Sequence, residues 1–362
     1  MTIDIIAGAR PNFMKIGPII HAIQRHNSQA STPIHYRLIH TGQHYDRAMS
    51  DSFFKQLNIP EPDINLGAGS GTQAEQTAAI MLGYEKALAV QKPDLCIVVG
   101  DVTSTMACAI VAKKAWVKVA HIEGGIRSGD LTMPEEINRI VTDSITDYFF
   151  TTSYTAGENL KAQGIRDEQI FFVGNTMIDS LMENLPRLQK PDFFDKQRFE
   201  PQKYIVMTLH RPSNVDNAQN LKNLLTIIND HCGDSKVIFP MHPRTKKVFD
   251  TIGITFDKLF ITGPMAYLQF IFLIKNALGV VTDSGGITEE TTVLHVPCMT
   301  LRDSTERPET VTIGTNEMVG THPENIIPYL HKLVNGQWKQ GSIPDLWDGK
   351  TADRIVNIIS KW

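Results

Sequence analysis

The chain has 362 residues, 42% of them hydrophobic and 20% charged, and its formal net charge is −4. This length and composition exclude a disordered chain and predict two folded domains, while the slight acidic excess argues against a dedicated nucleic-acid binder. The chain does not open with a basic segment and an apolar run, and its longest nearly apolar stretch, residues 266–274, is too short to span a bilayer, so we expect a cytoplasmic protein without a membrane partner.

Short apolar runs alternate with helical patterns along the whole chain. Runs without polar interruption are typical of strands buried on both faces, which indicates parallel sheets covered by helices. The predicted strands are residues 3–7, 36–40, 95–99, 118–122, 148–151 and 170–173, then 204–209, 236–239, 259–261, 279–282 and 298–301. Two such series predict an α/β fold of two Rossmann-like domains, residues 1–173 and 174–349. We expect a C-terminal helix at about residues 350–362 to pack back on the first domain.

The segment GARPNFMK follows the first predicted strand and opens a helix. It lacks the GxGxxG pattern, so binding of NAD or FAD loses its main support. Arg10 and Lys15 place two cations near the start of this helix. The segment is therefore either an anion site or an ordinary loop with solvated cations.

Asp283-Ser284-Gly285-Gly286 follows the predicted strand 279–282 and precedes a second helix. Ser284 can cap that helix, and the adjacent glycines let backbone N–H groups approach a ligand, which favours a phosphate. We expect Glu289 and Glu290 in the first turn, where one could bind ribose hydroxyls. The alternative is a simple cap with acids favoured by the helix dipole.

Four histidines, His40, His44, His210 and His242, lie at or just after predicted strand ends, two of them beside an arginine. Ligands bind outside the carboxyl ends of parallel strands, so this pattern indicates an anionic ligand. A metal is disfavoured because the chain has no HxH, HExxH or CxxC spacing. We therefore expect no metal and no cofactor.

Carboxylates follow two of the predicted buried strands. Asp101 comes after residues 95–99, and Glu123 comes after residues 118–122. Loss of solvent at such positions raises a carboxyl pKa towards acid–base use. Glu135 and Glu136 follow Pro134 and are expected to open a helix. Dipole compensation could explain that pair, and helix capping could explain Asp101, but neither explains Glu123.

Taken together, these motifs resemble the non-hydrolysing UDP-N-acetylglucosamine 2-epimerase family over essentially the whole chain. The matching blocks are GARPNFMK, HTGQHYD, VVGDVTST, HIEGGIRSGD, MPEEINR, VGNTMID, TLHRPSN, FPMHPRT, VTDSGGITEE and RDSTERPET. The resemblance implies a fold of the glycosyltransferase-B type, an active site in the interdomain cleft, and a homodimer.

The resemblance also implies roles for individual residues. The positions that match catalytic residues are Asp101, Glu123, Glu135 and His210. Among the positions that match substrate-binding residues, Arg10 and Lys15 would lie beside the diphosphate and Phe270 beside uracil, while Ser284, Gly285 and Glu290 would contact phosphate and ribose. The other matching binding positions are Gln43, His44, Arg139, His242, Gly286 and Arg307. Which carboxylate removes the proton and which returns it stays open.

The implied activity is reversible C2 epimerisation of UDP-GlcNAc to UDP-ManNAc for surface polysaccharide biosynthesis. It would run by anti elimination of UDP to a 2-acetamidoglucal, followed by re-addition. The short segment 131–133 resembles a branch acting on UDP-2,3-diacetamido-2,3-dideoxy-glucuronic acid, which is one alternative. A hydrolysing 2-epimerase and a glycosyltransferase are others. Asp46 and Gly69 depart from the family's allosteric pattern, which predicts loss of activation by UDP-GlcNAc.

Overall fold

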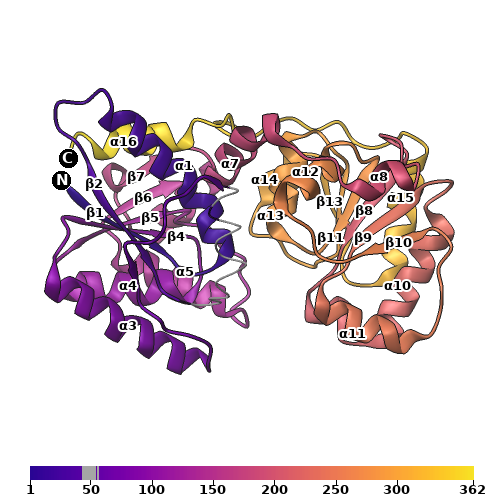
Figure 1. The fold of residues 1–362 in the computed structure, drawn as a ribbon, viewed down its shortest axis with the longest axis horizontal. Helices are drawn as coiled ribbons and strands as arrows, with labels where there is room; N and C mark the ends of the chain where they lie inside the picture. Colours follow the sequence, from indigo (N-terminus) through magenta and orange to yellow (C-terminus); the bar gives the residue numbers. More distant parts are fainter. Residues whose placement is uncertain (43–53, 55–56) are drawn as a thin grey trace. The chain divides into compact units, whose positions relative to one another are not determined.

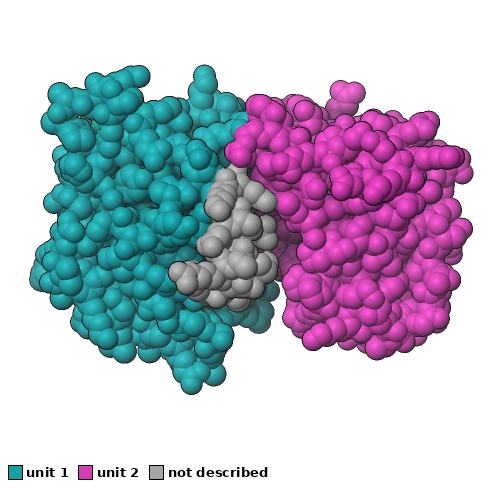
Figure 2. Space-filling view, in the orientation of Figure 1, with its two compact units in different colours: residues 1–183, 345–362 teal, residues 184–344 magenta. Residues whose placement is uncertain are grey.

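The computed structural model describes residues 1–42, 54 and 57–362. The chain forms two compact units, coloured separately in Figure 2. Unit 1 comprises residues 1–183 and 345–362, and unit 2 comprises residues 184–344. In the described part of the chain, no helix combines the length and apolar character needed to cross a membrane.

Unit 1 is built on a parallel sheet, with seven strands among its described residues (Figure 1). The strands are β1 (Thr2–Ala7), β2 (His35–His40), β3 (Ile64–Asn65), β4 (Leu95–Val99), β5 (Lys118–Ile122), β6 (Tyr148–Thr151) and β7 (Ile170–Phe172). Their order is β3-β2-β1-β4-β5-β6-β7. The direction of winding reverses between β1 and β4, which is where sheets of this kind bind ligands.

Helices cover both faces of the unit 1 sheet. They are α1 (Arg10–Asn27), α3 (Gln73–Val90), α4 (Thr103–Lys114), α5 (Pro134–Ile145), α6 (Tyr154–Ala162), α7 (Thr176–Asn184) and α16 (Thr351–Ile359), with a 3₁₀ turn η1 (Asp167–Gln169). Helices α3, α4 and α5 pack side by side on one face, and α1 packs with α16 on the other (Figure 1). The core under α3 and α4 includes Tyr84, Val98 and Val119, all fully buried.

The C-terminal segment returns to unit 1. Asp179 in α7 is buried and accepts hydrogen bonds from the backbone N–H groups of Thr351, at 3.1 Å, and Ala352, at 2.7 Å. The indole N–H of the fully buried Trp347 donates to the carbonyl of Thr152 at 3.0 Å. These bonds join the start of α16 to α7, and the segment before α16 to the end of β6, so that unit 1 includes both α7 and α16.

Unit 2 has a second parallel sheet, of six strands among the described residues. The strands are β8 (Tyr204–Thr208), β9 (Lys236–Pro240), β10 (Leu259–Thr262), β11 (Gly279–Thr282), β12 (Cys298–Thr300) and β13 (Asn316–Met318), in the order β10-β9-β8-β11-β12-β13. The helices are α8 (Asp192–Lys196), α9 (Pro212–Val215), α10 (Ala218–His231), α11 (Pro243–Ile252), α12 (Tyr267–Lys275), α13 (Gly285–Val293), α14 (Pro308–Thr312) and α15 (Ile327–Val334), with 3₁₀ turns η2 (Leu185–Arg187) and η3 (Pro323–Ile326). Winding reverses between β8 and β11.

The predicted α/β class with two parallel, Rossmann-like sheets is confirmed. Every predicted strand coincides with an observed strand to within one residue at each end. The strands that the sequence did not indicate, β3 and β13, have two and three residues. With only Ile64 and Asn65, β3 is too short to show a pattern, and two of the three residues of β13, Asn316 and Glu317, are polar, so neither segment forms an apolar run.

Candidate active site

The loop after β1 is held against the end of β4 at the winding reversal of unit 1. The buried Asn12 amide oxygen accepts hydrogen bonds from the N–H groups of Gly8, at 3.2 Å, and Ala9, at 2.9 Å. Its amide nitrogen donates to the carbonyl of Val99 at 3.1 Å. Arg10 begins α1 as expected, but its side chain lies outside the described part of the structure, as do the predicted binding residues Gln43 and His44.

Glu123 follows β5 in a tight turn. Its backbone has φ +69°, a left-handed conformation that is uncommon for a residue other than glycine. Its N–H donates a hydrogen bond to the carbonyl of Phe150 at 2.9 Å. Two residues on, Gly125 has φ +81°, and a Cβ there would lie 2.2 Å from the carbonyl oxygen of Ala156. Glycine is therefore required at position 125, and the turn places Glu123 at the carboxyl edge of the sheet.

The Glu123 carboxylate forms an ion pair with Lys15 of α1. Lys15 Nζ lies 2.7 Å from Oε2, and the Glu123 side chain is only 3% exposed. Lys15 was expected to face a diphosphate. In this structure its ammonium group neutralises the candidate acid–base carboxylate, which is 108 residues away in sequence.

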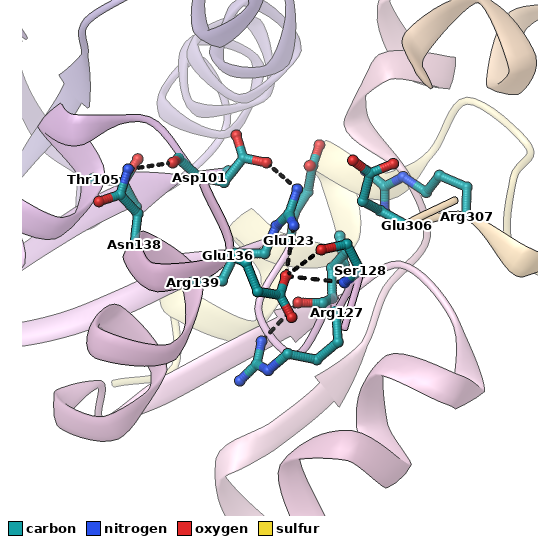
Figure 3. Close-up of polar contacts among 12 residues, drawn as sticks. Asp101, Thr105, Glu123, Arg127, Ser128, Glu136, Asn138, Arg139, Glu306 and Arg307 are labelled. Carbon is teal, nitrogen blue, oxygen red and sulfur yellow. Dashed lines mark hydrogen bonds and ion pairs between the residues drawn. The ribbon is translucent and has the colours of Figure 1, made fainter. Parts of the chain in front are cut away.

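A second carboxylate, Asp101, follows β4 and contacts Arg139 of α5 (Figure 3). The same guanidinium reaches Glu136 Oε2 through Nη1 at 2.8 Å. The Asn138 amide donates to the Asp101 carbonyl at 2.8 Å. Arg139, expected to bind substrate, is therefore buried between two carboxylates of its own chain. Asp101 does not cap α4, whose N-cap residue is Val102.

Glu135 and Glu136 both open α5, as predicted, but their surroundings differ. Glu135 is half-buried, whereas Glu136 is buried and accepts hydrogen bonds from Ser128 N–H at 2.9 Å, Ser128 Oγ at 3.0 Å and Gly129 N–H at 3.1 Å. Burial raises the pKa of Glu136, but these bonds and that from Arg139 outweigh it and leave the pKa below its ordinary value. Glu136 thus acts as an anchor for the loop before α5.

In unit 2, His210 and Asp283 meet at the winding reversal. His210 Nδ1 lies 2.8 Å from Asp283 Oδ1, and Asp283 also accepts hydrogen bonds from the N–H groups of His210 and Arg211 and from the Asn214 amide. Burial raises the pKa of Asp283, but His210 and these donors leave it below its ordinary value. The imidazole is half-exposed, so Nε2 is the ring nitrogen available to a ligand.

The start of α13 presents backbone N–H groups beside a buried cation. Ser284 occupies the N-cap position, but its side chain makes no capping hydrogen bond. A Cβ at Gly285 would lie 3.5 Å from Arg302 Nη1. The buried Arg302 forms a bidentate pair with Glu306, at 2.8 and 2.9 Å. Because Glu306 neutralises this cation, the feature that suits an anionic group is the helix start itself, with its backbone N–H groups.

The expectation that Glu289 and Glu290 lie in the first turn of this helix is wrong. Because α13 begins at Gly285, both fall in its second turn, and both are buried. Glu289 forms an ion pair with Arg307, and Tyr267 of α12 donates a hydrogen bond to Glu290 at 2.9 Å. The predicted binding residue Arg307 therefore contacts a carboxylate of its own unit.

Glu290 predicts a pH dependence of stability. Burial raises its pKa from 4.5 to about 8. The folded protein thus keeps the Glu290 proton at pH values where the unfolded chain loses it. The contribution of the protonated carboxyl group to the free energy of unfolding is therefore fully present below about pH 4.5 and is lost as the pH rises towards 8. Between pH 5 and 8, the wild-type free energy of unfolding should fall by on the order of 3 kcal/mol more than that of Glu290→Gln, measured by urea unfolding. Identical pH dependence in both proteins would contradict this.

The remaining predicted positions lie on neighbouring elements of unit 2. His242 is exposed and caps α11, where its Nδ1 accepts a hydrogen bond from the N–H of Arg244 at 3.2 Å. Phe270 lies on α12, three residues after Tyr267, and is half-buried. Gly286 lies in the first turn of α13.

Sequence reasoning missed His121 and Asp143. The structure buries both completely, in contact with each other at 2.6 Å, beneath the turns that carry Asp101 and Glu123. A signal was present, because His121 is a polar residue inside an apolar strand predicted to be covered on both faces, and such a residue needs a buried partner. The identity of that partner could not be read from local sequence.

Comparison with known proteins gives consistent matches over the whole chain. The family model described as UDP-N-acetylglucosamine 2-epimerase matches residues 26–360. A UDP-N-acetylglucosamine 2-epimerase of Methanocaldococcus jannaschii is 42% identical, over 99% of both chains, and a UDP-2,3-diacetamido-2,3-dideoxy-D-glucuronate 2-epimerase of Pseudomonas aeruginosa is 37% identical, over 100% of both. The crystal structure of the M. jannaschii UDP-GlcNAc 2-epimerase in complex with UDP-GlcNAc and UDP is similar with a TM-score of 0.86, at 41% identity and full coverage of both chains.

Proposed function

Because this chain belongs to the UDP-N-acetylglucosamine 2-epimerase family, we propose that it interconverts UDP-GlcNAc and UDP-ManNAc without releasing the sugar. The observation that carries this proposal is the pair of carboxylates, Asp101 and Glu123, that follow the adjacent parallel strands β4 and β5. Acid–base groups at one sheet edge are what inversion of a carbon centre needs. The 42% identity to an enzyme of that name supports the same substrate.

The chemistry explains why two kinds of site are needed. The C2 hydrogen of a hexosamine is not next to a carbonyl group, so its direct removal is very unfavourable. Elimination of UDP across C1–C2 forms a 2-acetamidoglucal: a base takes the C2 proton and the diphosphate leaves with the C1–O electron pair. UDP then adds back at C1 while an acid returns a proton to the opposite face of C2. The protein must hold the leaving group and place acid–base groups about C2.

We assign these tasks to separate groups of residues. Asp101, Glu123 and Glu135 of unit 1 are proposed to move the protons. The N–H groups at Ser284–Gly286 and His210 are proposed to hold the diphosphate, with Phe270 beside uracil. The raised pKa of Glu290 keeps this carboxyl group protonated at pH 7. It can therefore donate a hydrogen bond to one ribose hydroxyl and accept a hydrogen bond from another.

Incubation with UDP-GlcNAc in deuterated water tests the proposal. We expect UDP-ManNAc to form with deuterium at C2 in both epimers, without net release of free sugar. Stoichiometric ManNAc and UDP would instead identify a hydrolysing enzyme. Deuterium exchange only into UDP-2,3-diacetamido-2,3-dideoxy-glucuronate would favour the second candidate substrate, which the 37% identity to the Pseudomonas enzyme supports.

Arg10→Ala is expected to weaken UDP binding. The proposed contact with the diphosphate is a charge-assisted hydrogen bond worth about 1.5–3 kcal/mol, which corresponds to a roughly 10- to 100-fold rise in Kd. Calorimetry with UDP measures this. Arg25→Ala is the control, since Arg25 lies on the same helix and pairs with Asp353 at 2.7 Å. Equal Kd values for the two variants would contradict the assignment of Arg10.

The enzyme is also proposed to act as a cytoplasmic homodimer. The large apolar side chains exposed on unit 1 include Leu82 on α3 and Ile137 and Ile140 on α5. Helices α3, α4 and α5 pack side by side, so these residues belong to one layer of helices. Covering such a surface with a second copy would bury apolar area. Light scattering of the purified protein measures the oligomeric state.

A further inference from the structure

His121 lies in the middle of the unit 1 sheet with no solvent exposure. In β5 it pairs with Val98 of β4 on one side and Phe149 of β6 on the other, both fully buried. Its Nδ1 is 2.6 Å from Asp143 Oδ1, and its Nε2 is 2.8 Å from the carbonyl oxygen of Gly100. The imidazole is thus held at both nitrogens.

The two partners fix the number of protons on the ring. A carbonyl oxygen only accepts hydrogen bonds, so Nε2 must donate. Asp143 Oδ2 already accepts from the Gly125 N–H at 3.0 Å and pairs with Arg127 at 2.7 Å. The Arg127 guanidinium and the Gly125 N–H both favour the charged form of this carboxyl group, so we take it as ionised. An ionised carboxylate only accepts, and Nδ1 must donate as well.

These contacts join the turns that carry the two candidate catalytic carboxylates. Gly100, with φ +68°, directly precedes Asp101, and its N–H donates to the carbonyl of Ile122 at 3.0 Å. Gly125 follows Glu123 by two residues. A Cβ at the intervening Gly124 would lie 3.4 Å from His121 Nδ1, so the ring packs directly against this turn.

We propose that His121 is a positioning residue, held as a buried imidazolium, which together with Asp143 fixes the spacing between the turns of Asp101 and Glu123. The inference rests on the proposed epimerase function, because it concerns the acid–base groups of that reaction. Neutral histidine would turn a lone pair towards either Gly100 or Asp143 and release one of the two turns. Acid–base groups tolerate little displacement, since about 1 Å can cost roughly 10²-fold in rate.

The other charged groups near the ring are paired with one another. Asp143 lies on α5, and Arg127, in the loop after β5, contacts Asp143 rather than the imidazole. Glu123 is neutralised by Lys15 of α1, and Asp101 contacts Arg139. The adjacent strand positions, Val98 and Phe149, carry no charge.

Two substitutions of the same kind test the proposal by kinetics. Asp143→Asn removes the charge that holds the imidazolium. Asp147→Asn is the control. Like Asp143, Asp147 pairs with a cation and accepts a hydrogen bond from a backbone N–H: Lys113 Nζ and the Val119 N–H each lie 2.8 Å from its carboxylate. These contacts are at the opposite end of β5 from the candidate site. We expect Asp143→Asn to lower kcat by about 10²-fold with little change in KM, and Asp147→Asn to keep wild-type kcat. Equal kcat in the two variants would overturn the proposal.

The protonation state is measured without any change to the site. In the full-length enzyme labelled with ¹⁵N-histidine, both nitrogens of His121 should give protonated signals at the pH of the kinetic assay, assigned by their loss in His121→Gln. A neutral His121 in an active enzyme would overturn the proposal alone, even if Asp143→Asn does not fold. A wild-type enzyme inactive on both UDP-sugars would overturn the proposed function and the positioning role with it.

Discussion

Glu123→Gln is expected to lower kcat for C2 epimerisation by roughly 10²-fold or more while leaving UDP binding intact, because general acid–base catalysis contributes on that scale. The amide keeps the size of the side chain, and its oxygen can still accept a hydrogen bond from Lys15, which lies 2.7 Å from the carboxylate. The amide cannot take up or release a proton at the pH of the reaction. The loss should therefore appear in the chemical step.

Deuterium exchange at C2 and calorimetry with UDP separate these effects. Exchange should fall with kcat, while the Kd for UDP should change little. Glu183→Gln is a suitable control, because Glu183 lies in the same unit and pairs with His21 at 3.0 Å, midway along α1. Near-normal exchange in purified Glu123→Gln would remove this residue from the mechanism.

Arg139→Met is expected to destabilise unit 1 by about 3–5 kcal/mol, the usual cost of removing one partner of a buried ion pair. The guanidinium contacts both Asp101 and the buried Glu136, so its loss leaves two carboxylates without their shared cation. Methionine fills much of the same volume, which limits any cavity. Turnover should fall too, since Asp101 loses the contact that orients it.

Arg37→Met provides the matched comparison. Arg37 forms a bidentate pair with the fully buried Asp4, at 2.8 and 2.9 Å, near the amino end of the unit 1 strands. Urea unfolding should show a loss of several kcal/mol for both variants, in line with a broken buried pair. Only Arg139→Met should lose turnover per folded molecule. A loss of stability below about 1 kcal/mol for Arg139→Met would show that water or other groups replace the cation.

The sequence determined the local features of this fold. The unbroken apolar run at residues 95–99 and the largely apolar run at residues 118–122 identified buried parallel strands, because a strand covered on both faces has few polar positions. Since such strands end at a common edge, the polar residues after them, including Asp101 and Glu123, were recognisable as site candidates. The start of α5 at Pro134 was also readable, because proline and acidic residues favour a first turn.

Tertiary structure decided which of these side chains meet. Lys15 and Arg139, both predicted to bind substrate, are brought into contact with Glu123 and Asp101, because the segments after β1, β4 and β5 converge at the edge of the sheet. The pairing of His121 with Asp143 likewise depends on α5 packing over β5. A local pattern encodes periodicity and turns, which involve residues a few positions apart. The choice of partner for a buried charge depends on distances between elements far apart in sequence, and only the packed fold sets those distances.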